Sequence, residues 1–321
     1  MFSINFNSKF LLALSACVVT ATAAAAEFPT RDIRVIVPWP AGGGADAISR
    51  KISNIAEQDL SQSIYVENIA GAVTATGLIQ MTNARPDGHT VGMLTYDSVI
   101  TLPRGEMVPG YALDNMKLIA RITSEPDAIV VAQQTGIETF EQLIERAKEN
   151  PGEVRIGVAP KGSGPYLSAI QLEQLLDVDF NVITYAGSSS ASSEALLSGE
   201  LDAAISSLGD FSGIIESGDV RGVIELSSVQ NETYPDVPTI SSKGFDLQTG
   251  SFLVLAAPAN TPDDVVATLE STFKAAYDTE EFQSWLAQIG VTADWLGSDG
   301  VNDWVDGLQT KMFGLMDDLN L

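Results

Sequence analysis

Two series of alternating β-strand and α-helix patterns constrain the fold of this chain more than any other sequence feature. In the first series, Ile33–Val37 is a β-rich run, and apolar residues then recur at helical spacing from Ile48 to Ala56. Ile64–Val66 and Thr90–Leu94 indicate further strands. Strands that alternate with helices predict a parallel sheet covered by helices.

The second series follows Lys117–Ala132, which contains two short strand-like runs. Thr139 and Gln142 form a capping box that predicts a helix as far as Lys148. The later elements of the series are the strands Val154–Val158, Val182–Tyr185, Ala203–Ser206 and Val220–Leu226 and the helices Leu167–Leu176 and Ser193–Leu197.

The C-terminal part returns to the same pattern, with a strand followed by two helices. The expected strand is Ser251–Ala257, and Thr261 is the expected cap of the next helix, with Pro262 at its first position. Val265, Leu269 and Phe273 predict its buried stripe, and a last helix begins at Thr279 and ends at Gly290.

Two similar series without a long linker predict two α/β lobes joined by two crossing strands. We expect lobe one to comprise residues 27–125 and 246–321, and lobe two to comprise residues 126–245. A length of 321 residues and 45% hydrophobic residues are enough for two cores.

The N-terminus has the pattern of a secretory signal peptide at residues 1–26. Lys9 precedes the apolar run Phe10–Val19, and an Ala-rich end offers an A-x-A cleavage site at Ala24–Ala26. The run is shorter than the roughly 20 residues of a transmembrane helix, so we expect a periplasmic protein. Cys17, in Leu14-Ser15-Ala16-Cys17, leaves lipoprotein anchoring as the alternative.

Charge and cysteine usage exclude several classes of function. The net charge of −25 argues against a nucleic-acid partner, since affinity for phosphates comes from Lys and Arg. Cys17 is the only cysteine, so cleavage after Ala26 would leave no thiolate for catalysis or metal binding. The single histidine, His89, cannot form a metal site or a Cys–His dyad alone. We expect no cofactor and no metal.

The most distinctive loop is the segment from Pro38 to Asp46, between a predicted strand and a predicted helix. Its three consecutive glycines, Gly42 to Gly44, leave backbone N–H groups uncovered at a helix N-terminus, which favours binding of an anion. The alternative is a tight turn in which Asp46 caps the helix. A dinucleotide fingerprint also fits, as Gly42-x-Gly44-x-x-Ala47 with Glu67 downstream, but a lone match is weak.

Two loops of the second series have the same strand-to-helix position. One runs from Lys161 to Tyr166 and the other from Tyr185 to Ser190, and both are rich in Gly and Ser. Such residues offer N–H and hydroxyl donors without a fixed charge, although helix capping alone would use the same geometry.

The chain resembles the extracytoplasmic solute-binding proteins of tripartite tricarboxylate transporters, the Bug family. The resemblance is carried by Ile33–Asp46, Arg50, Val66-Glu67-Asn68, Gly71-Ala72, Pro86–Thr90, Tyr185-x-Gly187-Ser188, Gly199–Asp202, Pro235–Thr239 and Ala257-Pro258-x-x-Thr261-Pro262. It implies a type II periplasmic-binding fold that closes on a small carboxylate or dicarboxylate.

The resemblance also implies a set of ligand-binding residues. In the first lobe they are Trp39, Ala41, Gly42, Gly43, Gly44, Ala45 and Asp46, and in the second Ser163, Tyr185, Gly187 and Ser188. We add Lys161, Tyr166 and Ser206 to the expected ligand-binding residues. Val158 and Pro160 depart from the family pattern, and Lys161 is an added cation nearby. Lys161 would pair with a distal acidic group of the ligand, or would point to solvent.

Three hypotheses of function follow. The first is a monomeric binding protein that delivers a carboxylate to the membrane permease subunits of a transporter. The second is an exported binding module that feeds a sensor. The third is a dinucleotide-binding enzyme, which conflicts with export.

Overall fold

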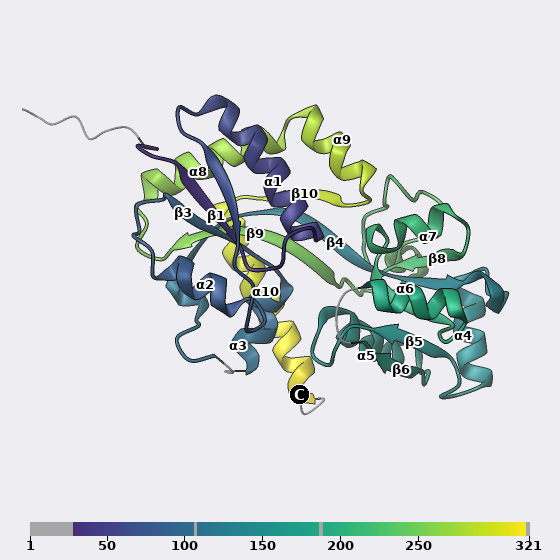
Figure 1. The fold of residues 1–321 in the computed structure, drawn as a ribbon. Helices are drawn as coiled ribbons and strands as arrows, with labels where there is room; N and C mark the ends of the chain where they lie inside the picture. The colour runs from purple at the N-terminus through teal and green to yellow at the C-terminus, as the bar shows by residue number, and fades with distance from the viewer. Residues whose placement is uncertain (1–27, 106–107, 186–188, 319–321) are drawn as a thin grey trace, which may run out of the picture.

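The computed structural model describes residues 28–105, 108–185 and 189–318, and shows two α/β lobes side by side (Figure 1). The predicted fold class is confirmed. The expected signal peptide at residues 1–26 lies outside the described residues. No helix of the described ranges is long and apolar enough to cross a membrane.

Lobe one is built on a mixed sheet with the strand order β2-β1-β3-β9-β4, and β10 pairs with the other edge of β4. The strands are β1 Ile33–Val37, β2 Ile64–Asn68, β3 Thr90–Leu94, β4 Met116–Ala132, β9 Gly250–Pro258 and β10 Thr292–Leu296. Alternate apolar side chains of these strands enter two separate cores, one on each face of the sheet.

Helices cover both faces of this sheet (Figure 1). One face packs against α1 Gly44–Ala56, α8 Asp263–Tyr277 and α9 Glu280–Gln288. The other face carries α2 Ala75–Thr82, a π-helical turn Asp97–Thr101 that leads into α3 Leu102–Gly105, and α10 Ser298–Asp318.

Lobe two repeats this layering on a smaller sheet. Its strands are β5 Arg155–Val158, β6 Asn181–Thr184, β7 Ala203–Ser207 and β8 Val220–Glu225, together with the second half of β4. Its helices are α4 Phe140–Glu149 and α5 Gly164–Leu176 on one face and α6 Ser189–Ser198 and α7 Ser212–Glu216 on the other.

A single strand, β4, runs through both sheets. Its residues from Met116 to Pro126 pair with β9, and those from Asp127 to Val131 pair with β7. The prediction of two short strands in this region was therefore wrong. The chain crosses back from lobe two to lobe one beside the middle of β4, where Asp127 N–H donates to Thr249 O at 3.0 Å. The lobe boundaries at residues 125/126 and 245/246 stay a prediction.

The strand directions turn the functional ends of both sheets toward each other. In lobe one, β1 and β3 are parallel, and β3 and β4 are both antiparallel to β9, so β4 runs in the same direction as β3. In lobe two, β5, β6 and β7 are mutually parallel and run against β4. The carboxyl ends of β1 and β3 therefore face those of β5, β6 and β7, and ligands of open α/β sheets bind at such ends.

Several helix boundaries follow the sequence signals. Thr139 and Thr279 cap α4 and α9 as predicted, accepting hydrogen bonds from Gln142 N–H (3.3 Å) and Phe282 N–H (3.2 Å). Thr261 does not cap α8, because its hydroxyl donates to Pro258 O and α8 begins at Asp263. Helices α2, α7 and the long C-terminal α10, and strand β10, were not predicted from the sequence.

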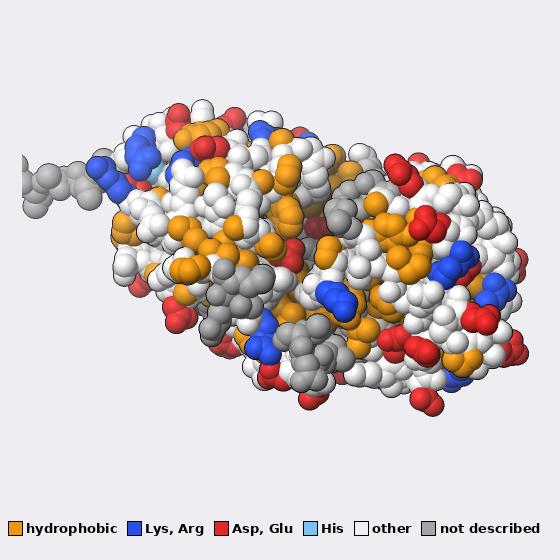
Figure 2. All heavy atoms as spheres, turned by 60° about the horizontal axis from the view of Figure 1, so that its bottom comes forward, with side chains coloured by type: hydrophobic (Ala, Val, Ile, Leu, Met, Phe, Trp, Pro, Cys, Tyr) orange, Lys and Arg blue, Asp and Glu red, His pale blue; other side chains and the backbone are white. Residues whose placement is uncertain are grey.

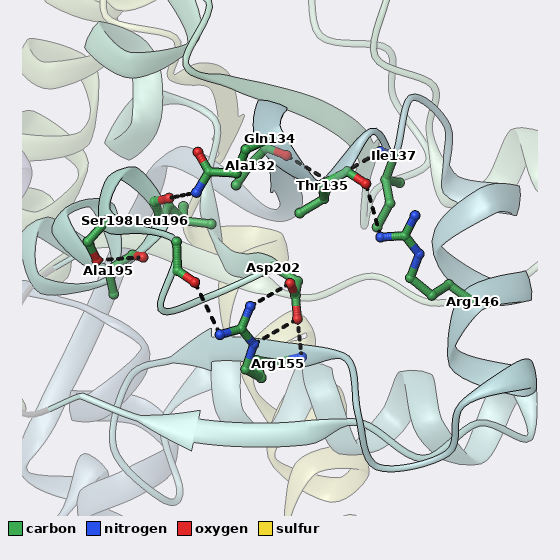
Figure 3. A network of polar contacts seen from close by, with 11 residues as sticks. Ala132, Gln134, Thr135, Ile137, Arg146, Arg155, Ala195, Leu196, Ser198 and Asp202 are labelled. Carbon is green, nitrogen blue, oxygen red and sulfur yellow. Dashed lines mark hydrogen bonds and ion pairs between the residues drawn. The ribbon is translucent and has the colours of Figure 1, made fainter.

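A polar network fixes the far end of lobe two (Figure 3). Asp202, just before β7, accepts bonds from Arg155 of β5 at its backbone N–H (2.9 Å), Nε (3.0 Å) and Nη2 (2.7 Å). Arg155 Nη1 also donates to Gly199 O at 3.1 Å. Burial raises the pKa of Asp202, but the bonds and charge of Arg155 outweigh it and hold the pKa below its usual range.

We expect Asp202→Ala to destabilise the protein by roughly 1–2 kcal/mol, because it leaves the Arg155 backbone N–H without its acceptor. The thermal midpoint should fall by about 2–6 °C. Since the folded-state pKa of Asp202 is lowered, its stabilising effect is present at neutral pH and is lost as the pH falls through that pKa, so wild type and variant should converge below about pH 4.

Calorimetric melts at pH 7 and at acidic pH check this expectation. Asp303→Ala, an exposed carboxylate on α10, is the matched control and should leave the midpoint unchanged. Equal midpoints for Asp202→Ala and wild type at pH 7 would contradict it.

Candidate functional site

The glycine loop between β1 and α1 lies at the carboxyl end of β1, where lobe one faces lobe two. A Cβ atom added at Gly42, Gly43 or Gly44 would meet no atom within 4 Å, so the backbone of this loop borders open space. Gly42 has φ +92°, a left-handed conformation that favours glycine, whereas Gly43 and Gly44 have ordinary φ angles. Turn geometry therefore does not require glycine at Gly43 or Gly44, and does not account for the open space beside them.

The loop is held in place by Asp46, which is 5% exposed. Its carboxylate accepts bonds from Gly42 N–H, Arg50 Nε and Asn68 Nδ2, each at 2.9 Å. Asn68 Nδ2 also donates to Trp39 O at 3.0 Å. Burial raises the pKa of Asp46, but these three donors together hold it below its usual range. Asp46 thus braces the loop instead of capping the helix.

The N-terminus of α1 is free to bind an anion. Gly43 is its N-cap and no side chain caps it. Among the described residues, none accepts a hydrogen bond from the N–H groups of Gly44 or Ala45. Free N–H groups and the positive end of the helix dipole favour a negatively charged group at this point.

The facing loop of lobe two precedes α5. Ser163 caps this helix and accepts a bond from Tyr166 N–H at 3.3 Å, so its hydroxyl has a structural role as well. The Tyr166 ring packs against the cores of both lobes. Lys161 is exposed and forms no ion pair with any residue of the described ranges.

The second facing loop is described only in part. Gly187 and Ser188 lie outside the described residues. The Tyr185 ring folds back over β5, where a Cβ at Gly157 would lie 3.4 Å from it. The ring packs against the core cluster that contains Leu201, just before β7, and burial and then the Glu200 carboxylate raise the pKa of Tyr185. The structure therefore does not bring this hydroxyl together with the glycine loop.

The crossing point of β4 adds polar residues that the sequence did not predict. Glu125 and Asp127 lie on β4 on either side of Pro126, and Asp210 follows β7. Ser206, a predicted site residue, donates its hydroxyl to Asp210. The signal in the sequence was a pair of carboxylates that flank Pro126 between two largely apolar runs.

A strained turn lies beside the carboxyl end of β3 in lobe one. Ala72, Val73 and Thr74, which precede α2, have φ angles of 46°, 48° and 76°, in the left-handed region that non-glycine residues seldom adopt. The Thr74 hydroxyl is 3.1 Å from that of Ser98, in the π-helical turn after β3. Strain of this kind is often found at functional sites.

Two residues of the alternative hypotheses have structural partners. Glu67 of the dinucleotide fingerprint pairs with Arg34 Nη1 at 3.2 Å. His89 is 4% exposed, accepts from Thr30 N–H at 3.0 Å and lies 3.1 Å from Asp87 Oδ1. Within the described residues, no group of three or more His, Cys, Asp and Glu side chains is placed to hold a metal ion.

The chain matches a known protein family. A family model described as "Tripartite tricarboxylate transporter family receptor" matches residues 48–321. Protein BugT of Bordetella pertussis is 25% identical over 277 residues, which are 85% of this chain and 85% of BugT. The resemblance predicted from the sequence motifs is confirmed.

Solved structures agree with the family match. A TctC solute-binding protein from Polaromonas superposes with a TM-score of 0.79 at 25% identity, over 91% of this chain and 99% of that chain. MatC of Rhodopseudomonas palustris, solved with bound malate, superposes with a TM-score of 0.73 at 23% identity, over 90% and 99% of the two chains. Both share the two-lobed fold.

Proposed function

The chain belongs to the tripartite tricarboxylate transporter receptor family, and from that premise we propose that it captures a small carboxylate between its lobes and delivers it to a membrane permease. Receptors of this family bind solutes and are not enzymes. The dinucleotide hypothesis is therefore set aside.

The open backbone of the glycine loop supports this proposal most strongly. Gly43 and Gly44 border open space, and the free N–H groups at the start of α1 lie at the end of lobe one that faces lobe two. Helix α5 also begins at the carboxyl end of its preceding strand, so a second helix dipole opposes the first. A carboxylate between the lobes would be stabilised by both helix dipoles.

The proposed contacts in lobe one are the N–H groups of the segment from Trp39 to Asp46. In lobe two they are Ser163, Ser206 and the loop that contains Gly187 and Ser188. The bound malate of MatC supports a small carboxylate as the ligand class. The pattern of residues 1–26 supports export to the periplasm, and a neighbouring gene for a polytopic permease would distinguish a transport partner from a sensor.

Lys161 is proposed as a contact at the rim. Because its side chain is exposed, an ion pair with a ligand carboxylate contributes about 0–1 kcal/mol. We therefore expect Lys161→Met to weaken a dicarboxylate by less than about fivefold and a monocarboxylate hardly at all. Titration calorimetry with matched mono- and dicarboxylates checks this. A much larger loss would mean that Lys161 becomes enclosed with its partner when the lobes close.

The capture proposal predicts closure of the lobes. The β4 strand and the return at Thr249 are the connections about which such lobes rotate, and closed sites bury most of a small ligand. A thermal-shift screen of carboxylates would identify a ligand, and small-angle scattering should then show a smaller radius of gyration at saturation. An unchanged radius with proven binding would contradict the proposal.

A further inference from the structure

Three carboxylates lie around the point where β4 passes from one lobe to the other. Glu125 pairs across the sheet with Ser251 of β9, and Asp127 pairs with Ser207 of β7. Asp210 lies in the turn that follows β7, and its negative charge raises the pKa of both Glu125 and Asp127. Figure 2 shows acidic side chains in the hollow between the lobes. The cluster is therefore assembled from both lobes.

These carboxylates have no cationic partner in the described part of the chain. No Lys, Arg or His nitrogen of those residues lies within 4.0 Å of Glu125, Asp127 or Asp210. Asp127 is 3% exposed and accepts one bond from Ser168 Oγ at 2.6 Å. Glu125 is half-buried and Asp210 is exposed, so the cost of burying a carboxylate without a countercharge falls mainly on Asp127, and a cation there would offset it.

A hydroxyl group without a partner lies beside these carboxylates. Tyr96 is 6% exposed, and its hydroxyl makes no hydrogen bond within the described residues. A Cβ at Gly164 would lie 3.8 Å from the Tyr96 ring and 3.9 Å from Asp127 Oδ2, so the ring and the carboxylate are neighbours. The buried Thr123 hydroxyl lies beside the Glu125 carboxyl and partly offsets the rise in its pKa.

Acceptor oxygens thus outnumber donors at this point. Carboxylates accept only, and each hydroxyl retains free lone pairs. An ammonium group has three donors and no acceptor, so it matches such a set, whereas a second carboxylate would be repelled. A metal ion fits less well, because the described carboxylates are not placed to hold one.

We propose that Glu125, Asp127, Asp210, Tyr96 and Thr123, here called the hinge acceptor cluster, receive an ammonium group of the ligand. The ligand class is then an amino-carboxylate. Its carboxylate lies at the glycine loop, so this inference rests on the proposed function, and its ammonium group lies at the hinge.

The affinity of the cluster for an ammonium group should change with pH in a characteristic direction. Burial and the charge of Asp210 raise the pKa of Glu125 to about 7, and burial raises that of Asp127 to about 6. The other titratable groups that act there are Tyr96 and Asp97. A bound ammonium group favours the ionised carboxylates, so protons leave on binding and affinity should rise from pH 5 to pH 8. A plain dicarboxylate would show the opposite trend.

Matched ligands test the inference by calorimetry at pH 7.5. The pairs are succinate with aspartate and butyrate with 4-aminobutyrate, in which each second member adds an amino group. We expect the amino member of at least one pair to bind tenfold or more tightly than its partner. Asp127→Asn and Glu125→Gln should each remove that preference, and Glu149→Gln, an exposed carboxylate on α4, should preserve it.

Two failures can be distinguished. If succinate or butyrate binds as tightly as its amino partner and the Asp127→Asn and Glu125→Gln variants change nothing, the cluster has no role in ligand choice, while carboxylate capture stands. If no carboxylate of either kind binds, the proposed function itself fails. Circular dichroism of both variants shows whether a lost preference reflects a lost fold.

Discussion

Replacing Gly44 with Val is expected to lower the affinity for the carboxylate ligand at least tenfold while the fold is retained. Gly44 is the first residue of α1, has an ordinary φ angle and would place its Cβ in open space. A branched side chain there would cover the N–H groups of Gly44 and Ala45 without a clash inside the protein. A tenfold loss corresponds to about 1.4 kcal/mol.

Titration calorimetry with the ligand from the thermal-shift screen measures this loss. Gly307→Val is the matched control, since Gly307 is an exposed helical glycine of α10 whose Cβ would also meet no atom within 4 Å. The control should bind as wild type does. Wild-type affinity for both Gly44→Val and Gly43→Val would remove the glycine loop from the site.

Asp46→Ala is expected to reduce both stability and binding. The substitution leaves Gly42 N–H and Asn68 Nδ2 without their acceptor beside a buried position, which costs about 2–3 kcal/mol. The thermal midpoint should fall by roughly 4–10 °C. Because the loop loses its brace, its N–H groups lose their orientation, and affinity should fall about tenfold or more as well.

The pH dependence separates this effect from general damage. Since the pKa of Asp46 is lowered in the folded state, its stabilising effect is present at neutral pH and is lost as the pH falls through that pKa. The difference between wild type and Asp46→Ala should thus shrink below about pH 4. Asp264→Ala, in the exposed first turn of α8, is the control, and a similar loss there would contradict a specific role for Asp46.

The glycine loop could be predicted because its evidence is local. A β-rich run, three glycines and a helical pattern follow one another directly, and the structure has β1, the open loop and α1 in that order. The role of Asp46 was less accessible. Its partner Asn68 is 22 residues away at the end of β2, so only the parallel pairing of β1 with β2 brings them together.

The continuity of β4 could not be predicted from its residues. The polar stretch from Thr123 to Asp127 contains Pro126, which has no N–H and usually ends a strand. In the fold, Pro126 lies opposite Gly250 at the point where β4 passes from the sheet of lobe one to the sheet of lobe two. The hinge acceptor cluster depends on this crossing, so its members could not be grouped from the sequence.

The Tyr185 side chain illustrates a different limit. Its position at the end of β6 correctly places its backbone near the gap between the lobes, where Tyr185 N–H donates to Val158 O. The ring lies over Gly157, which has no side chain of its own, and shares that space with Leu201 and Ser192. Sequence position therefore predicts which loop borders the site, but not which way a long side chain turns.

A crystal structure of the protein with a bound carboxylate would test the central claim most directly. We expect closed lobes, with a carboxylate oxygen about 2.7–3.2 Å from the N–H nitrogen of Gly44 or Ala45. A ligand bound elsewhere, with the glycine loop open and the lobes unmoved, would contradict it.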